Sequence, residues 1–171
     1  MSQFSGDIIK FNAMYGMPVS EVPTLISAQR LKDFKSILAK ELNEIDEIII
    51  KMEAIEEGMA NDYAPTEEQV TDVQVSLTDL FGDLQVYCAS EMVKWGLPLE
   101  LTLQIIMMSN FSKMGADGKP IYDEQGKLQK GPNYWKPEPR LKLMLEAVAV
   151  GCRAIQLNDQ ANALMDKALE D

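Results

Sequence analysis

The sequence predicts an all-α protein, a bundle of long helices with one long loop before the last helix. Apolar residues recur every three or four positions along stretches much longer than a strand, which is the spacing of one packed helix face. Glycine and proline gather between these stretches, above all in residues 112–139. With 171 residues, 46% of them hydrophobic, the chain has enough apolar side chains for the core of one domain, which we expect to span residues 1–171.

The first predicted helix covers residues 7–15 and is followed by a linker. Its sequence, DIIKFNAMY, places apolar residues at helical spacing, and Gly16 supplies a stop. The segment MPVSEVPT contains two prolines, which interrupt regular structure. We therefore expect the next helix to begin just after Pro23 and to end near Gly58.

This long second helix has an apolar seam with one interruption. The seam consists of Leu31, Phe34, Leu38, Ile45, Ile48, Met52 and Ile55. The position due between Leu38 and Ile45 is Glu41, and Glu44 lies one turn on, beside the same face. A carboxylate in a bundle core costs several kcal/mol unless it is paired or binds a cation. We interpret this break as a functional site and the other glutamates of the helix as solvated.

The third predicted helix runs over residues 67–94, with Thr66 as its N-cap. Its apolar seam consists of Val70, Val73, Leu77, Leu80, Leu84 and Tyr87. Asp79 and Asp83 are four residues apart, at the edge of its apolar seam, where like charges repel unless a cation lies between them. If the two long helices pack antiparallel at their midpoints, the two acidic pairs meet in an oxygen-lined cluster suited to Mg²⁺. Spacing alone leaves a merely solvated face as an equal alternative.

A short helix is predicted over residues 98–111, and a loop follows it over residues 112–139. The loop holds four of the ten glycines and four of the eight prolines. Loops of this length in compact domains are usually functional or disordered, and the loop's aromatic residues favour the functional reading. Within it, ADGKPIYDEQGKLQKG predicts a hairpin that turns at residues 124–126.

The final predicted helix, residues 140–169, has an unusually broad apolar face. Its members are Leu141, Leu143, Met144, Leu145, Val148, Val150, Cys152 and Ile155. A helix that is apolar over so wide a face is expected to be buried on two sides. We therefore expect it to meet a partner helix or a second subunit.

Composition excludes several classes of function. The chain contains no histidine, which removes Ser-His-Asp and Cys-His catalysis and HExxH zinc sites. The net charge of −11 argues against a nucleic-acid polymer as partner, because such binding needs a basic face. No apolar run reaches the length of a membrane span, and the N-terminus lacks the pattern of a signal peptide. The distant Cys88 and Cys152 are expected to be free thiols, so we expect a cytoplasmic protein.

The residues at the start and end of the loop have two readings. Taken alone, Asn110 and Lys113 are capping and solvation residues, and the lysines of the loop are a solvated surface. Beside a metal site the same lysines become phosphate ligands, since ammonium groups and Mg²⁺ neutralise phosphoryl charge. Tyr134 and Trp135 can stack on a base or pack in a core.

Three segments together resemble a known superfamily. These are the ExxE of KELNEI, the later DLFGDLQVY, and SNFSKMGADGKPIYDEQGKLQKGPNYWKP. They resemble the all-α nucleoside triphosphate pyrophosphohydrolases, and within them the MazG-like, phosphoribosyl-ATP-pyrophosphohydrolase-like branch, which is related to dimeric dUTPases. The segment KFNAMYGMP is similar to the usual opening of that branch, where a histidine often stands in place of Asn12. The resemblance covers residues 7–137, and its last motif is the longest and most specific.

The resemblance implies a helical subunit that forms a homodimer or homotetramer and binds Mg²⁺, with Mn²⁺ as a possible substitute. Glu41 and Glu44 match its first acidic pair, and Asp83 matches the last acid of its second motif. That motif is commonly ExxD, but Leu80 stands three residues before Asp83, so Asp79 is the available ligand and Glu68 or Asp72 are alternatives. The residues matched or assigned by position to substrate are Asn12, Asn110, Lys113, Lys119, Lys130 and Tyr134.

The implied function is Mg²⁺-dependent hydrolysis of a (deoxy)nucleoside triphosphate between the α and β phosphorus atoms, which serves to clean the nucleotide pool. Glu41 or Glu44 would orient or deprotonate the attacking water, and lysines of the loop would neutralise the departing pyrophosphate. One alternative keeps this chemistry with phosphoribosyl-ATP or dUTP as the specific substrate. Another is a catalytically silent helical assembly or regulatory module.

Overall fold

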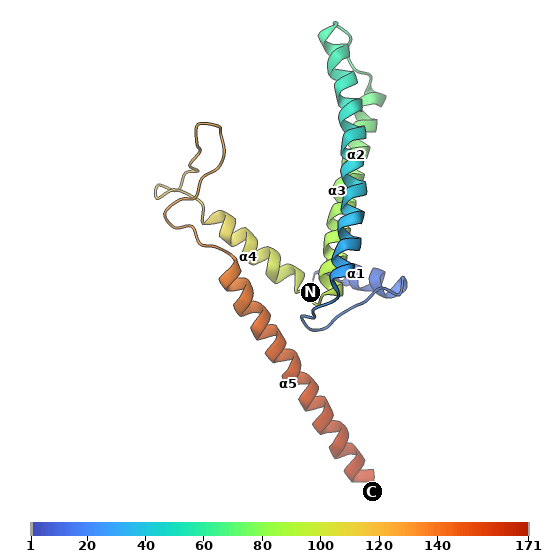
Figure 1. The fold of residues 1–171 in the computed structure, drawn as a ribbon, viewed down its shortest axis with the longest axis vertical. Coiled ribbons are helices and arrows are strands. Elements are labelled where there is room, and N and C mark those ends of the chain that lie inside the picture. The colour runs from blue at the N-terminus through green and yellow to red at the C-terminus, as the bar shows by residue number, and fades with distance from the viewer. Residues whose placement is uncertain (1, 171) are drawn as a thin grey trace. The chain divides into compact units, whose positions relative to one another are not determined.

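The computed structural model describes the backbone of residues 2–170 and the side chains of residues 2–160. It contains five helices: α1 (Gln3–Met14), α2 (Ala28–Ala60), α3 (Glu67–Lys94), α4 (Leu99–Phe111) and α5 (Glu138–Glu170) (Figure 1). Over this described part of the chain, the prediction of an all-α protein is confirmed. None of the described helices combines the length and the apolar character needed to cross a membrane.

The chain divides into two compact units. One consists of Leu25–Glu91 and holds α2 with nearly all of α3, and the other consists of Met1–Thr24 together with Met92–Asp171. The sequence predicts one domain over residues 1–171, and that assignment stays a prediction. Each unit is described by itself below.

The Leu25–Glu91 unit is an antiparallel helical hairpin, in which α2 and α3 lie side by side (Figure 1). Its core contains Ile48, Val73 and Leu80, with Ile45, Ile55, Leu77 and Leu84 packed against them. All seven belong to the two predicted apolar seams. Two cross-helix ion pairs show the antiparallel order: Arg30 near the start of α2 pairs with Glu91 near the end of α3, whereas Lys51 pairs with Asp72 at 2.8 Å.

Local signals explain where α3 begins. The backbone N–H of Gln69 donates to Oγ1 of Thr66 at 3.2 Å, and the backbone N–H of Thr66 donates to Oε1 of Gln69 at 2.9 Å. This reciprocal pair is a capping box, and it confirms Thr66 as the N-cap. The short connection before it contains Asp62 with φ 63°.

The second unit contains α1, α4, α5 and the long loop. The segment after α1 runs along the turn at the end of α3, where Thr24 N donates to Trp95 O at 2.9 Å. Gly96 has φ +64°, and a Cβ there would lie 2.0 Å from Val22 O, so both its conformation and its contact require glycine. α1 begins earlier than predicted because Ser2 caps it: Ser5 N donates to Ser2 Oγ at 3.3 Å.

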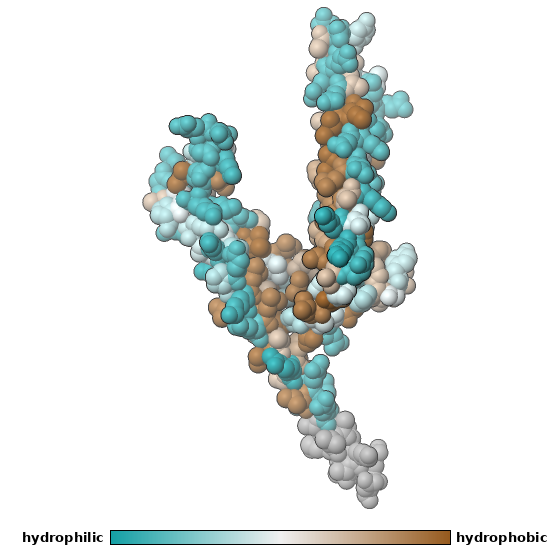
Figure 2. Space-filling model, viewed as in Figure 1, coloured by the Kyte–Doolittle hydropathy of each residue, from teal (hydrophilic) through white to brown (hydrophobic). Residues whose placement is uncertain are grey.

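Many large hydrophobic side chains of both units are exposed, and Figure 2 shows them as brown areas on the visible face. Those on α2 and α3 include Leu42, Ile50, Val75 and Phe81. On α4, Leu101, Leu103, Met107, Met108 and Phe111 are exposed. Apolar surface of this kind is typical of an interaction site. The predicted homodimer or homotetramer would cover it and stays a prediction.

Candidate active site

Glu41 is the buried acid of the helical hairpin. Only 6% of its surface is exposed, on the side of α2 that also carries the buried Ile48. Within the part of the chain that the structure describes, its Oε2 atom is buried without a hydrogen-bond partner. A buried carboxylate oxygen without a partner is unfavourable, because it has lost its hydration and gained nothing in return. The side chain of Glu41, which interrupts the apolar seam, therefore points into the hairpin.

The other three predicted acids lie close enough for their charges to act on Glu41. Burial raises the pKa of the Glu41 carboxyl group, and the negative charges of Glu44, Asp83 and Asp79 raise this pKa further. Glu44 and Asp79 are exposed, and Asp83 is half-buried. The structure thus brings all four acids together in one unit, from the middles of α2 and α3. Their roles as ligands and as catalytic base stay predictions.

Tyr87 lies close to these acids, although the sequence predicts it only as a member of the apolar seam of α3. Its hydroxyl group donates to Oδ2 of Asp83 at 3.2 Å. The same hydroxyl group acts on Glu41 and opposes the rise in the pKa of that carboxyl group. Burial and the charges of Asp83 and Glu41 raise the pKa of Tyr87, so its hydroxyl keeps its proton at neutral pH. The signal in the sequence was the spacing of four residues from Asp83.

The donors in this cluster suit a hard divalent cation. Carboxylate oxygens are the ligands of Mg²⁺, which keeps several waters and is commonly held by only one or two protein carboxylates. Oε2 of Glu41 is a buried oxygen available for such a bond. Among the described residues, no three Asp, Glu, Cys or His side chains are already arranged as a metal-binding group. The donor types of the cluster therefore fit Mg²⁺ in their chemistry, and binding of Mg²⁺ stays a prediction.

A shallow, open groove lies along one face of α3 next to these acids. It is lined by Thr71, Gln74, Val75, Thr78, Asp79, Gly82, Asp83 and Val86. Nothing lies within 4 Å of the position that a Cβ at Gly82 would take, so the groove is not filled by another part of the described chain there. The two aspartates of the cluster are consequently open to a ligand from this side.

The alternative ligands of the second motif lie elsewhere on the hairpin. Asp72 pairs with Lys51 at 2.8 Å, on an exposed part of the unit. Glu68 is exposed and lines a separate shallow groove near the start of α3. Asp79, in contrast, is one of the charges that raise the pKa of Glu41. Of the three candidates, Asp79 is the one supported by its surroundings.

The predicted phosphate-binding residues belong to the other unit, at the end of α4 and in the loop. Lys113 Nζ donates to Oδ1 of Asn110 at 2.8 Å. Gly131 N donates to Lys113 O at 2.9 Å, and a Cβ at Gly131 would lie 2.0 Å from Met114 O. The two segments of the loop are therefore in contact at Lys113 and Gly131. At the base of the loop, Oγ of Ser109 donates to Trp135 O at 2.8 Å, and Ser109 is only 3% exposed.

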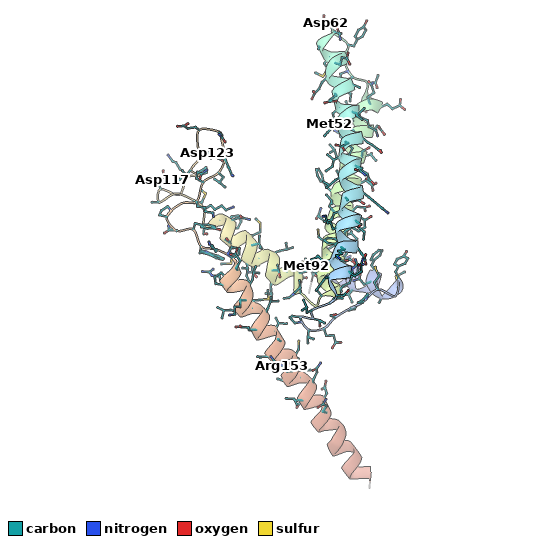
Figure 3. The ribbon with its side chains drawn as sticks, in the orientation of Figure 1. Met52, Asp62, Met92, Asp117, Asp123 and Arg153 are labelled. Atoms are coloured by element: carbon teal, nitrogen blue, oxygen red, sulfur yellow. The ribbon has the colours of Figure 1, made fainter. Side chains whose placement is uncertain are left out.

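The loop is ordered by its own aspartates and by cation–π contacts. Asp117 and Asp123, labelled in Figure 3, accept backbone N–H groups of their own turns, including Lys119 N at 3.0 Å and Lys127 N at 2.8 Å. An isolated antiparallel bridge joins Tyr122 and Leu128, which confirms the predicted hairpin. The ammonium group of Lys130 lies 4.6 Å from the centre of the Tyr134 ring. Two predicted substrate residues, Lys130 and Tyr134, are thus neighbours.

Two remaining predictions concern Asn12 and the cysteines. Asn12 is completely buried, and its Nδ2 donates to Pro18 O at 3.3 Å, so its side chain is part of the packing around α1. Its assignment to substrate stays a prediction.

Cys88 and Cys152 are both free, as expected, and Sγ of Cys152 lies 3.4 Å from Glu21 O.

The chain was compared with known proteins. It matches no family model and no curated protein. Among solved structures it is similar to a chain from Exiguobacterium sp. 255-15 described as a "putative NTP pyrophosphohydrolase", with 22% sequence identity and a TM-score of 0.44. The similarity covers 91% of this chain and 98% of that one.

Proposed function

We propose that this protein is a Mg²⁺-dependent nucleoside triphosphate pyrophosphohydrolase, which releases a nucleoside monophosphate and pyrophosphate. The observation that carries the proposal is the buried Glu41, whose Oε2 atom has no hydrogen-bond partner among the described residues and whose neighbours are three more acids. A buried carboxylate on which three more negative charges act is unfavourable without a cation. A cation held there would suit phosphate chemistry, in which it neutralises charge and acidifies a bound water molecule.

The acids of the cluster have two proposed roles, which are to bind the cation and to accept a proton. Glu41, Glu44, Asp79 and Asp83 would hold Mg²⁺, whose contribution in such sites is to neutralise phosphate charge and acidify a water molecule. Glu41 or Glu44 would accept the proton of the attacking water. Burial and the neighbouring acids raise the pKa of Glu41 in the cation-free cluster, and a bound cation would oppose this rise.

The loop would supply positive charge for the phosphates. Lys113, with Lys119 or Lys130, would neutralise the departing pyrophosphate, and Asn110 would hydrogen-bond a phosphate oxygen. Tyr134 would stack on the base. We also propose membership of the MazG-like, phosphoribosyl-ATP-pyrophosphohydrolase-like branch, from the motif SNFSKMGADGKPIYDEQGKLQKGPNYWKP, and assembly as a homodimer or homotetramer in the cytoplasm.

The test is product analysis by phosphorus NMR after incubation with Mg²⁺ and each of a panel of ribo- and deoxynucleoside triphosphates. We expect monophosphate and pyrophosphate in equal amounts from at least one of them. Diphosphate and inorganic phosphate would place the cleavage at the wrong bond and reject the proposal. Including dUTP and phosphoribosyl-ATP in the panel separates the two substrate-specific alternatives. Absence of hydrolysis of every nucleotide, together with no stabilisation by Mg²⁺, would favour the silent helical assembly.

A further inference from the structure

The hydroxyl group of Tyr87 lies at the acid cluster. It donates to Oδ2 of Asp83, one turn earlier in α3, at 3.2 Å, and it is near enough to Glu41 of α2 to act on the pKa of that carboxyl group. The ring itself packs in the helical hairpin, where Tyr87 is half-buried. A neutral donor therefore holds one carboxylate of the cluster, close to a second carboxylate from the other helix.

We infer that Tyr87 is a positioning residue of the acid cluster, whose hydroxyl group fixes the carboxylate of Asp83 beside Glu41 in the arrangement that receives a divalent cation. Carboxylate ligands that are themselves hydrogen-bonded have a fixed orientation, and removing such support typically weakens metal binding by 10–100-fold. The hydroxyl occupies Oδ2 of Asp83 and leaves Oε2 of Glu41 without a partner in the described chain. The inference rests on the proposed metal-dependent function, and it adds a residue that the acidic motifs do not contain.

A role in packing alone makes a different prediction. Tyr87 and phenylalanine have the same ring, so a packing role would leave Tyr87→Phe close to wild type in cation affinity. A positioning role predicts weaker cation binding with the helical hairpin intact, because only the hydrogen bond to Asp83 is lost. Since Tyr87 is assigned no contact with substrate, raised Mg²⁺ should restore kcat.

The experiment measures the Kd of the full chain for Mn²⁺ by electron paramagnetic resonance, without nucleotide, for wild type and Tyr87→Phe. The matched control is Tyr63→Phe, at an exposed tyrosine of the α2–α3 connection, where 74% of the residue surface is exposed. We expect Kd to rise about tenfold for Tyr87→Phe and to stay within about twofold for Tyr63→Phe. Far-UV circular dichroism checks that all three proteins have the same helix content.

Each outcome decides a separate point. If wild type binds Mn²⁺ and Tyr87→Phe binds it equally well, the positioning role is wrong while the proposed function stands. If wild type neither binds Mn²⁺ nor hydrolyses any nucleotide, both are wrong. A kcat of Tyr87→Phe that stays low at saturating Mg²⁺ would also overturn a role through the cation. Should Tyr87→Phe not fold, Tyr87→Met removes the hydroxyl group and fills the half-buried position with a flexible apolar side chain, and an unchanged Kd for that variant would reject the inference.

Discussion

The backbone N–H of Gly131 donates to the carbonyl oxygen of Lys113 at 2.9 Å, and the two segments of the loop are in direct contact there. Lys113 follows α4, whereas Gly131 lies 18 positions later, next to Lys130. This contact keeps two of the proposed phosphate-binding lysines in a fixed relation. It is possible only because residue 131 has no side chain.

Gly131→Ala should therefore disturb the loop. The added Cβ would lie 2.0 Å from Met114 O, a backbone atom that cannot turn aside, so one segment of the loop must move. We expect KM for the nucleotide to rise about tenfold or more, while the helix content measured by circular dichroism stays the same. Gly151→Ala is the control, because nothing lies within 4 Å of the added Cβ. Equal KM values for both variants would show that the loop does not position the substrate.

Glu41→Gln should remove activity and leave the protein at least as stable as wild type. The carboxylate is the proposed ligand and base, and losing a general base costs roughly 100-fold or more in kcat. Because burial and neighbouring charges raise the pKa of Glu41, its favourable contribution to stability is present below the ordinary pKa of 4.5 and is lost as pH rises through the raised value. The free energy of unfolding of wild type should thus fall relative to Glu41→Gln as pH rises from 4.5. Glu47→Gln, at an exposed position of the same helix, should show neither effect.

Glu100→Gln tests the opposite sign of pH dependence. Hydrogen bonds from Ser5 Oγ at 2.5 Å and from Ser2 N and Oγ at 2.8 Å lower the pKa of Glu100 to about 2. A lowered pKa contributes stability above the ordinary value of 4.5, and this contribution is lost as pH falls towards 2. Since Glu100 is exposed, we discount the effect for solvent screening to about 1–2 kcal/mol at pH 7. Urea unfolding should show the variant less stable at pH 7 and similar to wild type near pH 2, and a constant difference would contradict this origin.

Mg²⁺ should stabilise the protein without any nucleotide. A cation that binds only the folded state at 100 times its Kd adds about 2.7 kcal/mol to the free energy of unfolding. We expect differential scanning calorimetry to show a Tm that rises with Mg²⁺, returns after chelation with EDTA, and no longer responds in Glu41→Gln. Na⁺ at matched ionic strength is the control for general screening of the net charge of −11. A shift of the same size with Na⁺ would mean that the acids bind no specific cation.

The helical hairpin was predictable because its two apolar seams are regular and its ends have local signals. α3 spans Glu67–Lys94, as predicted, since Thr66 caps it and Gly96 follows it. The break at Glu41 was visible for the same reason: a charged residue in an otherwise regular pattern is easy to see. The hairpin of the loop was predictable from its turn residues, which need no information from the rest of the chain.

The rest depends on contacts between residues far apart in the sequence. α1 begins at Gln3 because Ser2 caps it and Glu100 binds Ser2 and Ser5, and no local pattern reveals a partner 98 residues away. Tyr87 was counted as apolar because periodicity reports where a residue points and not what its hydroxyl group reaches. Asp79 was preferred to Glu68 and Asp72 from its position in the motif alone, and the sequence could not reveal that its charge acts on Glu41.

The antiparallel order of α2 and α3 makes the acid cluster sensitive to chain length. Each extra residue within a helix turns everything beyond it by about 100° and advances it by about 1.5 Å. One residue inserted between Glu41 and Gly58 would therefore carry the acids of α2 out of phase with Asp83 and Tyr87, whereas one inserted in the connection at residues 61–66 would be absorbed there. The hairpin can therefore be lengthened at its tip without disturbing the acids. Within the helices, whole turns must be added to or removed from α2 and α3 together.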